Sequence, residues 1–124
     1  MLLSLAIFAT LCLLADAVLV VPSVFGDGCV LQTNAEYGAR SSIYGWANPT
    51  ETVTVVLSNS ASGKPIGNYS AIADASSGEW AVTLNPLRED LPAFDVTITT
   101  ASGGHHVAHA CVVGDVYVCS GQSK

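Results

Sequence analysis

The residues with the clearest potential for chemistry lie at the end of the chain, in the string G-D-V-Y-V-C-S-G-Q-S-K at 114–124. Residues 116–118 form a short apolar run that predicts a strand, and small residues follow it in a tight turn. Such a turn is common in surface loops, but several hydrolase folds use one to expose a nucleophilic serine. Because a serine hydroxyl is a weak nucleophile, it also requires a general base and a group that orients that base.

Three histidines are the candidate bases: His105, His106 and His109. The first two follow a Gly-Gly turn, and His109 lies three residues further along a predicted strand. A catalytic histidine must reach the serine and must be oriented by a carboxylate. Nothing in the local sequence indicates such an arrangement, so we interpret the three as solvated turn and strand residues. Metal binding by this cluster is the weaker alternative.

The terminal string closely resembles G-D-V-W-L-C-S-G-Q-S-N-M, the block around the nucleophile in the sialate O-acetylesterases. These are secreted or lysosomal serine esterases with an SGNH-type catalytic domain. Weaker similarities precede the string: F-G-D-G-C-V-L-Q resembles the family's F-x-D-x-M-V-L-Q, and S-G-E-W-A-V-T-L resembles D-G-x-W-x-V-x-L. The resemblance implies that Ser123 is the catalytic nucleophile and that the substrate is O-acetylated sialic acid or a related acetylated glycan. Lys124 departs from the pattern, because the family has Asn there.

The resemblance also predicts how the chain is organised. In the family, the oxyanion-hole blocks and an Asp-x-x-His block that supplies the base lie beyond the nucleophile motif. No Asp stands three residues before any histidine of this chain. We therefore expect residues 114–124 to be the truncated start of an SGNH-type domain, contributing its first strand. By itself, the chain is expected to be an N-terminal fragment without esterase activity.

A second hypothesis is a secreted, non-catalytic β-sandwich that binds carbohydrate or protein. Tyr44, Trp46 and Trp80 are the candidate sugar-stacking residues for this function. Aromatic side chains within strand patterns belong more often to the core, and we favour that interpretation here.

Residues 1–17 predict a secretory signal peptide, because an apolar run at 1–14 precedes the small-x-small cleavage site Ala15-Asp16-Ala17. A helix needs about 20 apolar residues to span a bilayer, and this run is shorter. An uncleaved membrane anchor is therefore the less favoured alternative. We expect a secreted or lysosomal protein without membrane association after cleavage.

The net charge of −6 does not indicate nucleic-acid binding, which usually requires a basic surface. Asn68 begins a glycosylation sequon.

Removal of residues 1–17 leaves three cysteines: Cys29, Cys111 and Cys119. An exported compartment permits disulfides, and an odd count leaves at least one thiol unpaired. Cys29 with Cys111 is a conceivable pair that the sequence alone does not assign. The spacing matches no zinc site, and no cofactor is indicated. We interpret Cys119, within the terminal string, as a buried packing residue.

Residues 18–113 predict an all-β domain, because short β-branched segments alternate with turn signals and no helical period occurs. The alternation is clearest at 52–57 and 94–99. We expect a small, jelly-roll-like β-sandwich with further strands at 18–25, 29–32, 43–46, 71–73, 80–84 and 106–113. The expected core consists of Val30, Leu31, Ile43, Trp46, Val53, Val55, Leu57, Trp80, Val82, Leu84, Phe94, Val96, Ile98, Val107 and Val112.

Overall fold

The computed structural model describes residues 18–33, 37–117 and 119–122; the predicted signal peptide at 1–17 lies outside them. Within the described residues the chain forms strands and one short 3-10 helix, η2 (Ser23–Phe25), and no α-helix. No helix there is long and apolar enough to cross a membrane. The strands are β1 (Leu19–Val20), β2 (Val30–Leu31), β3 (Ser42–Ala47), β4 (Thr52–Asn59), β5 (Pro65–Ile72), β6 (Glu79–Thr83), β7 (Phe94–Thr100) and β8 (His105–Val113).

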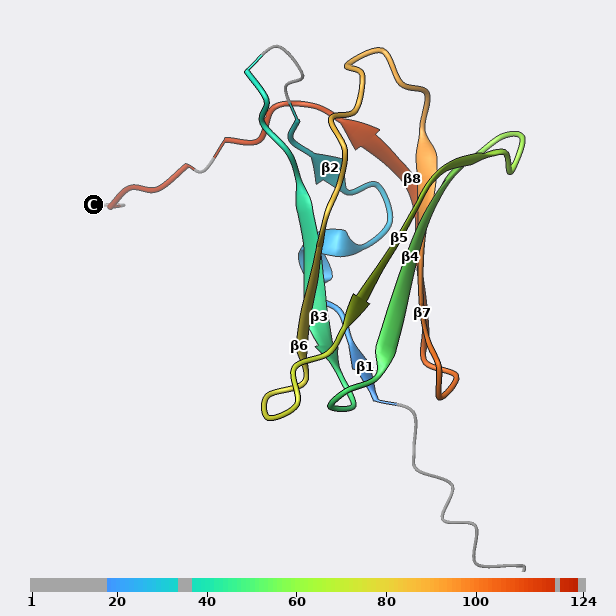
Figure 1. The fold of residues 1–124 in the computed structure, drawn as a ribbon. Helices are drawn as coiled ribbons and strands as arrows, with labels where there is room; N and C mark the ends of the chain where they lie inside the picture. Colours follow the sequence, from blue (N-terminus) through green and yellow to red (C-terminus); the bar gives the residue numbers. More distant parts are fainter. Residues whose placement is uncertain (1–17, 34–36, 118, 123–124) are drawn as a thin grey trace, which may run out of the picture.

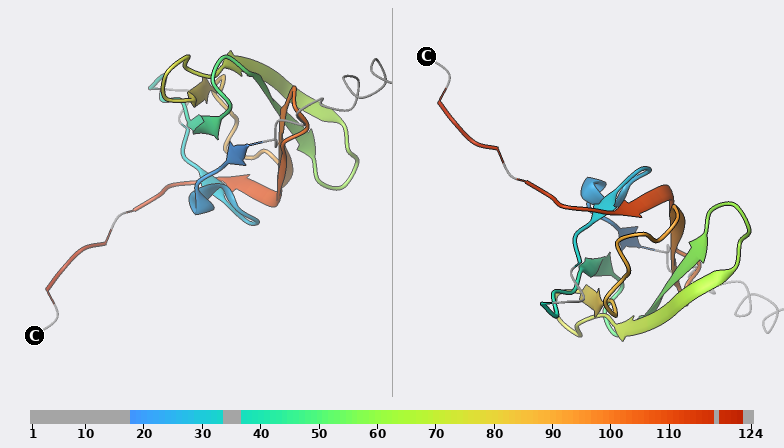
Figure 2. Two further views of the ribbon diagram at one scale, coloured as in Figure 1. Left: turned by 90° about the horizontal axis from the view of Figure 1, so that it is seen from below. Right: turned by 90° about the horizontal axis from the view of Figure 1, so that it is seen from above.

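The strands form two sheets that face each other, as Figure 1 and the end-on views of Figure 2 show. The smaller sheet has the order β1-β3-β6, and all of its pairs are antiparallel. The larger sheet has the order β2-β8-β7-β4-β5, in which only β2 and β8 run parallel. The predicted all-β sandwich is therefore confirmed.

The core lies between the inner faces of the two sheets. Along β4 and β7 every second side chain is buried, because successive side chains of a strand point to opposite faces. Most of the predicted core residues are buried: Leu31, Ile43, Val53, Val55, Leu57, Trp80, Val82, Leu84, Phe94, Val96 and Ile98.

The prediction that Val30 and Val112 are core residues is wrong, since both side chains are exposed, and Val107 is only half-buried. Val30 is the immediate neighbour of the buried Leu31 in β2, so strand alternation turns it outward. In β8 the buried positions are instead Ala108 and Cys111.

A β-bulge explains the change of phase in β8. Phe94 pairs with Cys111 and Val96 pairs with Ala108, so β8 carries one residue more than β7 over this stretch. Ala110, within the extra stretch, has the positive φ of 56°. The bulge moves the inward positions of β8 by one residue, and no local sequence pattern announces it.

Strand boundaries differ most from expectation at the two edges. The predicted strand at 18–25 shortens to β1, and the chain then turns through η2 after Pro22, which cannot donate to a ladder. The predicted strand at 71–73 extends into the eight residues of β5, which begins at Pro65 on the edge of the larger sheet. Asn68 of the sequon is exposed on this edge strand.

The C-terminal stretch runs away from the sandwich in Figures 1 and 2. The strand predicted at 116–118 is not formed in its described residues, Val116 and Tyr117, and the side chain of Tyr117 is 80% exposed. Cys119 is exposed, so its assignment as a buried packing residue is wrong. A strand needs a neighbour to pair its backbone N–H and C=O groups. After Gly114, whose N–H donates to the carbonyl oxygen of Leu31 at 3.2 Å, residues 115–117 and 119–122 pair with no described strand.

Candidate functional site

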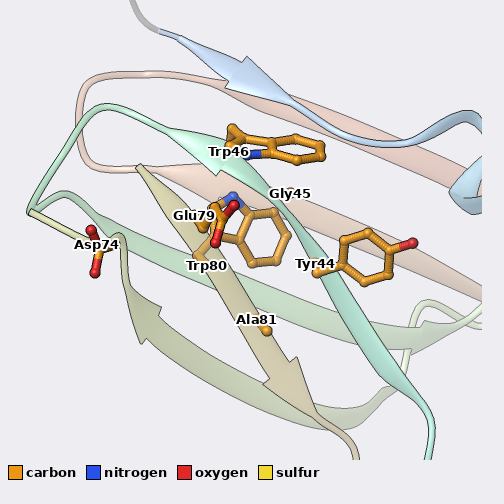
Figure 3. Close-up of a pocket in the computed structure, with 7 residues that line it drawn as sticks. All are labelled: Tyr44, Gly45, Trp46, Asp74, Glu79, Trp80 and Ala81. Atoms are coloured by element: carbon orange, nitrogen blue, oxygen red, sulfur yellow. The ribbon is translucent and has the colours of Figure 1, made fainter. Parts of the chain in front are cut away.

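The outer face of the smaller sheet carries two large aromatic side chains, shown in Figure 3. Tyr44 and Trp46 alternate with buried positions along β3, and they are 45% and 40% exposed. On the neighbouring strand β6, Ala81 lies opposite Tyr44 and Glu79 lies opposite Trp46. The prediction that Trp46 belongs to the core is therefore wrong. The two aromatic side chains stand beside a small residue and an acidic one.

Tyr44 and Trp46 point outward because strand alternation turns inward the residue between them, Gly45. It occupies the inward position of β3 opposite Trp80, whose side chain is only 3% exposed. A Cβ atom at residue 45 would lie 2.3 Å from the carbonyl oxygen of Val20 and 3.0 Å from the Trp80 ring. The indole from β6 and the Val20 carbonyl oxygen therefore leave room for only a glycine at this inward position.

A shallow cavity of about 520 Å³ lies at this face. Its volume falls within the range that small-molecule sites usually have. It has no basic residue among its lining, and the small side chain at Ala81 leaves room beside the Tyr44 ring in Figure 3. The lining residues are Tyr44, Gly45, Trp46, Asp74, Glu79, Trp80 and Ala81.

Asp74 is held in place at the rim of this aromatic cavity. Its Oδ1 accepts hydrogen bonds from the backbone N–H groups of Ser76 (2.9 Å) and Ser77 (3.0 Å), and from the Ser76 hydroxyl (2.8 Å). These donors stabilise the charged carboxylate and hold the pKa of Asp74 far below its usual range. The cavity therefore offers aromatic faces beside a fixed anionic acceptor.

A second group of polar side chains lies on the larger sheet around Asp95. The Ser60 hydroxyl donates to Asp95 Oδ1 at 2.6 Å, and His109 Nδ1 lies 3.5 Å from Asp95 Oδ2. These residue types match a catalytic triad, but their order does not, because the base must lie between the serine and the carboxylate. Here the carboxylate lies in the middle, so His109 has no route to the Ser60 proton.

The hydrogen bonds of Asp95 indicate a structural role for this group. Besides the Ser60 hydroxyl, the backbone N–H of Ala110 donates to Asp95 Oδ1 at 3.1 Å, and both donors lower the pKa of Asp95. The bulge in β8 is thus tied to β7 through this side chain. The other histidines fit the same interpretation: His106 Nε2 lies 2.8 Å from the carbonyl oxygen of Phe25, and His105 is exposed. Among the described residues no His, Cys, Asp and Glu side chains group to hold a metal ion.

Ser123 and Lys124 lie outside the described residues, so their surroundings stay a matter of prediction. The sequence indicates Tyr44, Trp46 and Trp80 as candidate sugar-stacking residues and favours the core for all three. The structure divides them, with Trp80 inside and the other two outside. The string Y-G-W is the signal that could have separated them. Strand alternation turns its glycine inward, so the two aromatic residues beside the glycine point outward.

The sandwich is similar in structure to part of a known esterase. No family model matches the chain, and no curated protein matches it. In structure it is similar to a carbohydrate acetylesterase from Xanthomonas citri, with a TM-score of 0.61 and 26% sequence identity. The match covers 79% of this chain and 19% of that enzyme's chain, so the chain spans well under two thirds of the enzyme's length. The similarity supports an esterase relationship for the sandwich.

Proposed function

We propose that this chain is the N-terminal β-sandwich portion of a serine esterase that removes O-acetyl groups from sialic acids. The observation that carries the proposal is the structural similarity to a carbohydrate acetylesterase over 79% of the chain. The terminal string at 114–124, which resembles the nucleophile block of the sialate O-acetylesterases, narrows the proposed substrate to O-acetylated sialic acid. The signal peptide predicted at 1–17 would direct the protein to the cell exterior or the lysosome.

In the proposed reaction, the hydroxyl of Ser123 attacks the acetyl carbonyl carbon while a base takes its proton. Hydrolysis needs the nucleophile, the base and the oxyanion donors together, and loss of the nucleophile or the base costs on the order of a millionfold in turnover. The described histidines have other surroundings: a carbonyl oxygen faces His106 and a carboxylate faces His109. We therefore propose that residues 1–124 by themselves have no esterase activity.

Acetate release from O-acetylated sialic acid tests the inactivity of the isolated chain. The purified chain and its Ser123→Ala variant are both expected to stay at the background rate. Turnover by the unmodified chain that disappears in the variant would overturn this part of the proposal, because a base would then reach Ser123.

The esterase assignment itself is tested at the gene. Sequencing of the transcript and its genomic locus is expected to reveal a reading frame in which Asn follows Ser123 and an Asp-x-x-His block occurs downstream. When that frame is expressed, it should release acetate, and its Ser123→Ala variant should not. Absence of both motifs from every frame would remove the assignment to an active esterase.

A second candidate function is carbohydrate binding at the outer face of the smaller sheet, and the aromatic cavity favours it. A pyranose ring has an apolar C–H face that can lie on Tyr44 or Trp46, and hydroxyl groups that can donate to Asp74 or Glu79. Sialic acid carries a carboxylate of its own, which the acidic lining repels. We therefore expect the cavity to prefer the neutral sugars of a glycan.

Binding of neutral oligosaccharides and of sialic acid by the purified chain tests this second function. Titration followed by tryptophan fluorescence is expected to detect the neutral sugars alone, with affinity reduced about tenfold or more in Trp46→Ala. Thr97→Ala, on the outer face of the larger sheet, serves as the matched control and should bind as the unmodified chain does. Equal affinity in Trp46→Ala and the unmodified chain would exclude this cavity as the sugar-binding site. That result would not affect the esterase assignment.

A further inference from the structure

We propose that Cys29 and Cys111 form a disulfide bond when the protein meets an oxidant. Their sulfur atoms lie 2.7 Å apart, nearer than two unbonded sulfur atoms normally approach. Both side chains belong to the core, with exposed fractions of 8% for Cys29 and 0% for Cys111. The proposal concerns cross-linking of the sandwich and does not depend on either function proposed above.

The backbone positions of the two cysteines suit a disulfide. The parallel strands β2 and β8 place Val30 opposite Val112, so that Cys29 and Cys111 face each other one residue earlier. The N–H of Val112 donates to the carbonyl oxygen of Cys29 at 2.9 Å, which continues the strand pairing to this position. Neighbouring strands lie about 4.8 Å apart, within the Cα separation of about 4.4–6.8 Å that disulfides allow.

The bulge in β8 brings Cys111 to the inner face. Ala108 is buried, so strict alternation would turn residue 111 outward, but the extra residue of the bulge turns it inward. Side chains and backbone hold this arrangement from both sides. Asp95 Oδ1 accepts the N–H of Ala110 at 3.1 Å, and Asp27 Oδ1 accepts the N–H of His109 at 2.8 Å. The two sulfur atoms are therefore held together by the fold.

Thiol–disulfide exchange supplies a balanced route, with glutathione disulfide as the oxidant. The thiolate of Cys29 attacks one sulfur of glutathione disulfide, which forms a mixed disulfide and releases one glutathione thiolate. The sulfur of Cys111 then loses its proton and attacks the Cys29 sulfur of the mixed disulfide, releasing the second glutathione. Two electrons and two protons thus pass from the cysteine pair to two glutathione thiols.

Cys29 is the better first nucleophile of the pair. It is the more exposed of the two, and its hydrogen bond with the Cys111 thiol lowers its pKa. The same neighbour and burial raise the pKa of Cys111, so Cys111 reacts second. Cys119 is exposed on the stretch that leaves the sandwich, which leaves it as the free thiol of the cross-linked protein.

Cleavage before aspartate tests the pairing in the unmodified chain, because these sites separate every cysteine. Peptide 27–73 carries only Cys29, peptide 95–114 carries only Cys111, and peptide 115–124 carries only Cys119. After treatment with glutathione disulfide, alkylation of free thiols and digestion, mass spectrometry should find peptides 27–73 and 95–114 joined, and alkylated Cys119. Alkylated Cys29 and Cys111, or a bond from either to Cys119, would overturn the proposal.

Thermal unfolding gives a second readout that does not depend on digestion. The bond closes a loop between residues 82 positions apart, and such long loops gain the most from a cross-link. Addition of a reductant should lower the Tm of the oxidised chain by about 10 °C or more. Cys119→Ala should keep this reductant effect, and Cys29→Ala should lose it. A reductant effect of the same size in Cys29→Ala would exclude the bond.

Discussion

The outer faces of the two sheets obey the same alternation, yet they carry opposite kinds of side chain. On β4 the large apolar Val55 points into the core and Thr54 points outward. On β3 the inward positions belong to Ile43, Gly45 and Ala47, and Tyr44 and Trp46 point outward between them. A polar outer face is what solvent favours on a half-buried sheet. Tyr44 and Trp46 therefore present apolar surface on this outer face, and the Tyr44 ring also contacts the buried Phe25, with ring centroids 5.3 Å apart.

The difference between the sheets follows from what fills the space between them. The larger sheet fills its own half of the core from β4 and β7, through side chains such as Phe94 and Ile98. In the smaller sheet, the Trp80 ring of β6 packs over Gly45 of β3, so β6 supplies the core volume at this position. Ile43 still contributes to the core from β3, while Tyr44 and Trp46 lie on the outer face. Substitutions on the inner and outer faces test this difference.

The largest expected effect comes from removing an aromatic ring on the inner face rather than the outer one. Phe94→Ala should reduce the free energy of unfolding by about 3–5 kcal/mol, because Phe94 is fully buried and its loss leaves a cavity. Trp46→Ala should cost less than half as much. Urea unfolding of both variants measures the difference. Equal losses would mean that Trp46 supports the core as much as Phe94 does.

A smaller effect is expected at Gly45, the glycine between the two outward aromatics. Gly45→Ala should reduce the free energy of unfolding by about 1–3 kcal/mol, since the added methyl group meets the Val20 carbonyl oxygen and the Trp80 ring. Gly121→Ala is the matched control, because a Cβ there meets no atom within 4 Å. Calorimetric unfolding that finds the two variants equally stable would contradict the tight packing of β3 against β6.

The two sheets should respond alike to acid, through Asp74 at the cavity rim and Asp95 on the larger sheet. Hydrogen bonds lower the pKa of each carboxyl in the folded state. The two carboxylates therefore stabilise the folded state fully above their pKa in the unfolded state, which is about 3.9. This stabilisation declines as the pH falls below that value, because protons then bind the unfolded state more readily than the folded state. In measurements from pH 7 to pH 2.5, we expect the urea concentration at the unfolding midpoint to decrease once the pH is below 4.

Substitution of each carboxyl separates the two contributions to this acid response. Asp74→Asn and Asp95→Asn should each make the decrease of the urea midpoint below pH 4 smaller, since an amide does not titrate. Asn85→Asp introduces a new exposed carboxyl as a control and should leave the fall intact. A fall of unchanged size in both Asn variants would assign the acid response to other groups.

The smallest expected effect lies at Trp80, beneath the aromatic face. Its Nε1 is buried and has no hydrogen-bond partner among the described residues, which costs stability. Trp80→Phe removes this unpaired N–H together with some packing volume, and the two effects offset each other. We expect a change of less than about 1 kcal/mol. A loss of several kcal/mol in urea unfolding would indicate that the indole volume dominates.

Much of the fold was predictable, and the failures have local causes. Alternation in β4 and β7 correctly identified inward residues such as Val55 and Val96. The same rule failed in β8, because the bulge at Ala110 shifts its phase without any breaker residue in the sequence. The core prediction for Trp46 failed for another reason: it followed from the aromatic residue type, whereas alternation with the inward Gly45 turns Trp46 outward.

By itself, the sequence determined the all-β class and the inward residues of β4 and β7. These features depend on backbone preferences and on neighbours a few positions away. Only the tertiary structure decided that Trp80 packs over Gly45, and that Cys29 meets Cys111. Both outcomes depend on which strands become neighbours and on the volume that each inserts between the sheets. Residues 82 positions apart share a contact because the sandwich closes around them, and no local pattern of side chains encodes that distance.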